Sequence, residues 1–120
     1  MNPRKTGDLG ERIAADYLKK QGYHIRELNF HTREGEIDII AEKDDFLVFV
    51  EVRTRRSSSM VTPEESVTPY KLARIIATAQ SYIQSHEDLP PCWRIDVVAV
   101  ELKPKGKKLA RIELIENVTS

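Results

Sequence analysis

This sequence of 120 residues has one cysteine, no net charge and no long apolar run. Its single cysteine, Cys92, excludes an internal disulfide and a zinc site built from cysteines. The three histidines are scattered, without the close spacing of a helical metal-binding pair. No apolar run approaches the length of a membrane span or follows the first residues as in a secretory signal. We therefore expect a cytoplasmic protein with no membrane partner.

The chain also lacks net charge. Nineteen basic residues balance nineteen acidic ones, which excludes the strong positive field of a nonspecific nucleic-acid coat protein. Any nucleic-acid contact must then come from local patches. Two such patches are present, one of arginines and one of lysines that is more typical of a solvated hairpin turn: Arg53, Arg55 and Arg56, and Lys103, Lys105, Lys107 and Lys108.

Turn residues and apolar spacing predict elements in the order α-β-β-β-α-β-β within one domain, residues 1–120. One helix is predicted over residues 8–21 with Gly22 as its stop signal, and another begins at Pro69 with Thr68 as its N-cap. Residues 54–67, rich in serine and arginine, are expected to form a mobile loop above a site. The predicted strands cover residues 23–29, 36–41, 46–53, 93–102 and 109–116. This order is typical of an α/β fold in which a mixed central β-sheet is flanked by helices.

Two carboxylates interrupt the apolar sequence of the predicted hairpin. Asp38 has isoleucine on either side, and Glu51 lies between Val50 and Val52. Buried carboxylates need a partner, and a divalent metal ion is one that two of them can share. If the turn between the strands has two or four residues, Asp38 and Glu51 share one face with Arg53, whereas an odd number would place them on opposite faces. The even turn predicts a metal site.

The acidic residues also have structural interpretations. Asp38 and Glu51 could face solvent on an edge hairpin, with Arg33 and Arg53 as surface partners that contribute little energy. Asp96, also within a predicted strand, is better explained as a hydrogen-bonded structural carboxylate or as a group that supports the metal ligands.

Five segments, in this order, resemble the PD-(D/E)XK nuclease superfamily and, within it, the YraN-like family, whose relatives include archaeal Holliday-junction resolvases. They are GDLGERIAADYLKKQGY, HTREGEIDIIA, FVEVRTRR, VTPEESVTPYKLARIIATAQSYI and WRIDVVAVEL. The resemblance implies a restriction-endonuclease-like fold and a site for Mg²⁺ or Mn²⁺. By position, it makes Asp38, Glu51 and the carbonyl of Val52 metal ligands, and Glu11 an acidic helix residue near the site. Alternatively, Asp8 and Glu11 fit the spacing of a capping box at a helix start.

The chain departs from the nuclease pattern at Arg53, where the family usually has lysine. Arginine stays protonated, so it can bind a phosphate but cannot act as a general base, and activation of water would fall to the metal ion. Ile37 also replaces the proline that usually precedes Asp38, but that position supplies no ligand. The residues expected to contact nucleic acid are Arg53, Arg55, Arg56, Lys71 and Arg74.

The function expected from these residues and this resemblance is metal-dependent endonuclease activity on DNA, with branched or junction DNA as the suggested substrate. Cleavage of a junction requires two active sites, which would make the protein a homodimer. Arg53 and the neutral chain motivate the alternative of a nucleic-acid-binding or processing accessory protein with a degenerate nuclease site. In a third interpretation the acids only pair with Arg33, Arg53 and Arg55 in a structural or interaction domain.

Overall fold

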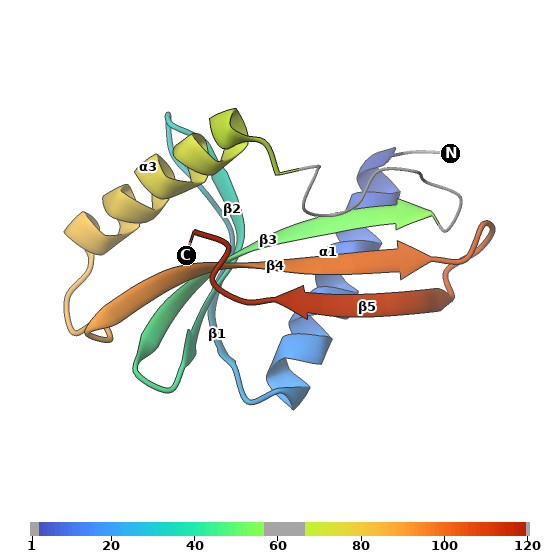
Figure 1. Ribbon diagram of the computed structural model, residues 1–120, viewed down its shortest axis with the longest axis horizontal. Helices are drawn as coiled ribbons and strands as arrows, with labels where there is room; N and C mark the ends of the chain where they lie inside the picture. Colours follow the sequence, from blue (N-terminus) through green and yellow to red (C-terminus); the bar gives the residue numbers. More distant parts are fainter. Residues whose placement is uncertain (1–2, 57–66, 120) are drawn as a thin grey trace.

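The structure, a computed structural model, describes residues 3–56 and 67–119, with side chains from Gly7 onward (Figure 1). Its elements are α1 (Pro3–Lys20), β1 (His24–His31), β2 (Glu36–Lys43), β3 (Phe46–Arg56), α3 (Pro69–Ser85), β4 (Cys92–Leu102) and β5 (Leu109–Ile115). The strands form one sheet in the order β1-β2-β3-β4-β5, in which β3 and β4 are parallel and the other neighbours antiparallel. Within the described residues this confirms the predicted α/β fold, its element order and its mixed sheet.

The two described helices cover opposite faces of the sheet. On one face, Leu18 of α1 belongs to a buried cluster with Val48 and Val50 of β3. On the other, Ile75 of α3 belongs to a second buried cluster with Phe49 of β3. Successive residues of a strand point to opposite faces, which explains why β3 is apolar almost continuously before Glu51.

The residues that end α1 and begin α3 are those predicted. Gly22 has the left-handed φ of 92°, and the N–H of Tyr23 donates to the Leu18 carbonyl at 2.9 Å, which ends α1. The Thr68 hydroxyl accepts from the N–H of Lys71 at 3.2 Å and caps α3. Neither described helix is long and apolar enough to cross a membrane.

Four predicted boundaries were wrong by two residues or more, and one of them is the end of β2, which runs to Lys43 rather than to residue 41. The first helix begins at Pro3 rather than at residue 8, and β1 runs on to His31. The third strand extends to Arg56 because it pairs with β4 over its whole length. Residues 54–56 of the predicted mobile loop are therefore strand, and residues 57–66 of that loop lie outside the described residues.

A close approach at Gly10 fixes α1 against β3. A Cβ at this position would overlap the Thr54 side chain, and even the Thr54 Cβ would be only 2.8 Å away. At Gly7, one turn earlier in α1, nothing lies within 4 Å of such a Cβ. Of these two glycines of α1, only Gly10 is required by packing, and its lack of a side chain lets the helix approach the end of β3.

We expect Gly10→Ala to lower the free energy of unfolding by about 2–3 kcal/mol, because overpacking costs more than the gain in helix propensity. Gly7→Ala is the matched control, since it makes the same change in the same helix and is expected to raise the free energy of unfolding by up to about 1 kcal/mol. Urea denaturation of both variants measures the difference. Equal effects would contradict the close approach.

Candidate functional site

The site lies where two neighbouring strands separate. A turn of two residues, Asp44 and Asp45, joins β2 to β3, and the strands pair from Lys43 opposite Phe46 to Ile39 opposite Val50. Beyond that point β2 remains paired with β1, and β3 with β4. Figure 1 shows the two strands diverging on the side away from their hairpin. The predicted strands left a turn of four residues, 42–45, which is two residues too long, but the turn is even as the metal site required. It directs Asp38 toward Glu51 where the strands part.

The Asp38 carboxylate bridges this gap. Its Oδ2 accepts a hydrogen bond of 2.8 Å from the backbone N–H of Val52, in place of a strand-to-strand hydrogen bond. The N–H and C=O of an extended residue project from the same edge of a strand. The Val52 carbonyl is therefore directed to the same gap, where it was predicted to serve as a ligand.

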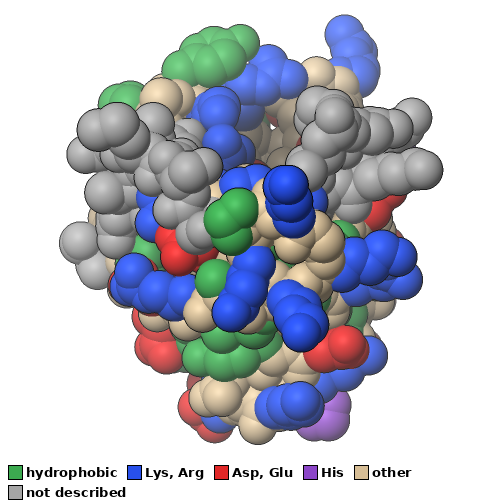
Figure 2. Space-filling view, turned by 90° about the vertical axis from the view of Figure 1, so that its right-hand side faces the viewer, with side chains coloured by type: hydrophobic (Ala, Val, Ile, Leu, Met, Phe, Trp, Pro, Cys, Tyr) green, Lys and Arg blue, Asp and Glu red, His purple; other side chains and the backbone are tan. Residues whose placement is uncertain are grey.

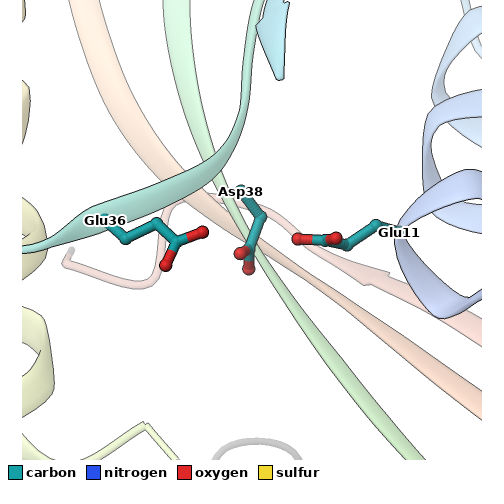
Figure 3. Close-up of side chains that lie close together, drawn as sticks. All are labelled: Glu11, Glu36 and Asp38. Atoms are coloured by element: carbon teal, nitrogen blue, oxygen red, sulfur yellow. The ribbon is translucent and has the colours of Figure 1, made fainter. Parts of the chain in front are cut away.

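Figure 3 shows three carboxylates that point toward one another, from Glu11 on α1 and from Glu36 and Asp38 on β2. Each contributes an oxygen that lies within 4.8 Å of the others. Glu51 of β3 adjoins this group through Asp38, with which it interacts by charge and by a hydrogen bond. An open pocket of about 400 Å³ contains Glu11, Asp38 and Glu51, and it is further lined by Gly7, Asp8, Val52, Arg53 and Thr54.

Burial and the crowding of like charges raise the pKa values of two carboxylates in this site. Burial raises the pKa of Glu51 to about 8, the Asp38 carboxylate acts in the same direction, and Arg53 opposes both. The pKa of Glu11 is raised to about 7, first by burial and then by Asp38, with smaller contributions from the charges of Glu36 and Asp8. The folded protein thus resists full ionisation of this cluster, and a cation among the oxygens would relieve the repulsion.

The structure brings together most of the predicted site. Glu11, Asp38, Glu51, Val52 and Arg53 all line the same pocket. The alternative in which the acids face solvent does not hold for Glu51, whose side chain is 17% exposed. The Arg53 guanidinium lies 3.4 Å from the Glu51 carboxylate, as the ion-pair interpretation required for this pair.

Two details differ from the sequence-based expectation. The capping-box role of Asp8 and Glu11 is wrong, because α1 begins at Pro3 and both residues lie inside the helix. Glu36 was not among the predicted ligands, although it joins the acidic cluster. Its spacing of two residues from Asp38 was the available signal, since alternate residues of a strand share a face.

The family model described as "Uncharacterised protein family UPF0102" matches residues 10–100. The chain belongs to this family. It is 48% identical to a UPF0102 protein of Dehalococcoides mccartyi, over 97% of this chain and 93% of the relative. It is 46% identical to one of Syntrophomonas wolfei, over 91% and 95%, and 48% identical to one of Syntrophus aciditrophicus, over 94% and 87%. The resemblance to nucleases stays a prediction.

The five basic residues predicted to contact nucleic acid in this UPF0102 protein have different surroundings. Arg53 lines the pocket, whereas Arg55 pairs with Glu101 of β4 at 2.9 Å and Arg56 bonds the carbonyls of the β4–β5 turn. Arg74 lies 5.7 Å from the centre of the Tyr70 ring, and Lys71 is exposed on the first turn of α3. A nucleic-acid surface built from these five arginine and lysine residues therefore stays a prediction.

Asp96 of the UPF0102 fold has the structural role that was favoured for it. Its carboxylate is fully buried and accepts hydrogen bonds from the Tyr23 hydroxyl at 3.0 Å, the Arg94 guanidinium at 3.1 Å and the Asn117 N–H at 2.8 Å. Burial, with the charge of Asp96, raises the pKa of Tyr23 to about 12. Because Asp96 is satisfied by these partners, it needs no metal ion.

Proposed function

We propose that this UPF0102 protein is a metal-dependent endonuclease that hydrolyses phosphodiester bonds in DNA, with branched DNA as its substrate class. The observation that supports this most strongly is the convergence of Glu11, Asp38 and Glu51, from three different elements, in one pocket beside Arg53. Acidic oxygens next to a cation that can bind phosphate are what metal-assisted phosphodiester hydrolysis requires. The restriction-endonuclease-like fold and the kinship with junction resolvases belong to the same proposal.

The donor set fits Mg²⁺ or Mn²⁺. Every side-chain donor in the acidic cluster is a carboxylate oxygen, which hard divalent cations prefer. Asp38, Glu51 and the Val52 carbonyl would hold the ion, with Glu11 and Glu36 close by. When bound, the ion would neutralise charge on the phosphate and activate water.

Side chains of the pocket would bind the phosphate and stabilise its charge. Arg53 is held near the pocket by Glu51, stays protonated, and presents a guanidinium that can bind two phosphoryl oxygens at once. It stabilises negative charge that develops on the phosphoryl group and cannot accept a proton. Glu11 lines the same pocket, and its pKa of about 7 belongs to the metal-free protein, because a bound cation would favour the charged carboxylate. Glu11 would therefore lie beside the ion as a carboxylate.

The experiment that tests this function has two parts. Calorimetric titration should detect Mn²⁺ binding by the wild type and its loss in Asp38→Asn. The substitution keeps the shape of the side chain almost unchanged but removes the negative charge of the ligand. Labelled flapped and four-way DNA should then be cut in Mg²⁺ or Mn²⁺ in preference to linear DNA, and all three should be left intact in EDTA. A wild type that binds no Mn²⁺ would refute the proposal.

The second candidate is a nucleic-acid-binding accessory protein with a degenerate site. It is motivated by Arg53 at the usual lysine position and by the ion pair that this residue makes with Glu51. DNA binding without cleavage would favour it. If neither metal nor DNA binds, the interpretation in which the acids pair only with arginines is the better one. A cytoplasmic location and a homodimer stay predictions that accompany the endonuclease proposal.

A further inference from the structure

The β4–β5 turn, residues 103–108, has four exposed lysines: Lys103, Lys105, Lys107 and Lys108. The turn lies at the end of the molecule to which β3 and β4 point in Figure 1. Figure 2 faces this end and shows lysine and arginine side chains gathered across it. The turn, residues 103–108, contains these four lysines and no acidic residue, so it is a local site of positive charge in a chain without net charge. Such a patch attracts a polyanion.

Arg56 fixes this turn to the strand that contributes Glu51 and Arg53. Its guanidinium donates to the Lys103 carbonyl at 2.9 Å and to the Gly106 carbonyl at 2.7 Å. The turn is also closed by a hydrogen bond of 2.9 Å from the N–H of Lys103 to the carbonyl of Lys108. The backbone below the lysines is thus held in one arrangement, which lowers the cost of ordering it on a ligand. Arg56, which was predicted to contact nucleic acid, thus also positions the backbone that carries these lysines.

The distance from the pocket to the turn follows from the sheet register. In the parallel β3–β4 pair, Glu51 is opposite Val97 and Arg56 is opposite Leu102. Five residues of strand span about 17 Å, at roughly 3.3 Å per residue. Phosphates of one DNA strand advance about 3.4 Å along the helix axis per base pair. A duplex arm that follows β3 from the pocket would therefore reach the turn about five base pairs from the phosphate bound there.

We propose that the β4–β5 turn is a second phosphate-binding element, which holds a duplex arm of the substrate about five base pairs from the cleaved bond. This inference rests on the proposed function. The turn has the sequence Lys-Pro-Lys-Gly-Lys-Lys, which offers cations and no aromatic ring on which a base can stack. Its contacts are therefore with the DNA backbone and are independent of base sequence.

Two pairs of adjacent lysines allow a matched test. Lys107→Gln/Lys108→Gln changes the turn, and Lys19→Gln/Lys20→Gln makes the same change at the exposed C-terminal end of α1. Binding of labelled branched DNA to the full chain is measured by fluorescence anisotropy over a range of salt concentrations, with Ca²⁺ in place of Mg²⁺. We expect the salt slope of the turn variant to fall by about 2, because each lost phosphate contact accounts for about 0.9. The α1 variant should keep the wild-type slope.

Arm length provides a second measurement. The wild type should bind a branch with arms of about twelve base pairs more tightly than one with arms of about four, because only the longer arm reaches the turn. The turn variant should bind both alike. An unchanged slope, or an equal loss in the two lysine variants, would overturn the inference while leaving the proposed cleavage untouched. Equal competition by polyglutamate and by DNA would overturn the duplex assignment. A wild type that binds no DNA would refute the proposed function itself.

Discussion

Glu51→Gln is expected to reduce metal-dependent DNA cleavage by on the order of 1,000-fold or more, while leaving the fold intact. Glutamine has nearly the same volume as glutamate, so packing around β3 is kept. The substitution removes one negative ligand and also the partner that holds Arg53 beside the pocket. The affinity for the cation should fall, and the phosphate-binding guanidinium of Arg53 should lose the contact that holds it in position.

The matched control for this result is Glu101→Gln. Glu101 also lies on a strand and pairs with an arginine of β3, at 2.9 Å from Arg55, and its side chain is 21% exposed against 17% for Glu51. It does not line the pocket. Initial cleavage rates at saturating Mn²⁺ should therefore be close to wild type in Glu101→Gln. If the two variants lose activity equally, the acidic pocket is not the site of cleavage.

The second large effect expected is a loss of stability with rising pH in metal-free protein. The pKa of Glu51 is about 8 in the folded state, above the ordinary 4.5 of an exposed glutamate. The folded state thus binds more protons than the unfolded state between these values. The contribution of Glu51 to stability is full below pH 4.5 and falls as the pH rises toward 8. We expect a decrease of roughly 2–4 kcal/mol, to which the raised pKa of Glu11 adds in the same direction.

Chemical denaturation in EDTA between pH 5 and 8 measures this decrease. Glu51→Gln should flatten the profile and make the metal-free protein more stable than wild type at pH 8, since its amide stays neutral. Glu101→Gln should retain the wild-type slope. Adding Mn²⁺ should restore stability at pH 8 more than at pH 5, because the cation replaces protons in the pocket. A wild-type profile that rises from pH 5 to 8 would contradict the burial of a repelling carboxylate pair.

Local patterns in the sequence were sufficient for the element order and for part of the site. Thr68 before Pro69 marks the start of α3, and alternation within β2 and β3 places Asp38 on the same face as Glu51 once the turn is even. Each of these signals depends on a few consecutive residues. The lysine-rich turn was also visible in the sequence, but nothing in its own residues distinguishes a solvated turn from a binding surface.

Other features required contacts between distant segments. The capping-box interpretation of Glu11 was wrong because the helix extends further toward the N-terminus than its apolar spacing indicates. The position of Glu11 beside Asp38 depends on how closely α1 packs on β3, which Gly10 allows. The attachment of the lysine turn to Arg56 depends on the β3–β4 pairing.

The sequence by itself determined the order of the elements and which acidic residues interrupt the apolar strands, because periodicity and turn chemistry act over a few neighbouring residues. Only the tertiary structure decided that β2 and β3 separate beyond Ile39 and Val50, and that α1 brings a further carboxylate to the gap. Strand separation and helix docking are set by packing between segments far apart in the chain. That packing concentrates negative charge in one pocket and directs a basic turn toward the same end of the sheet.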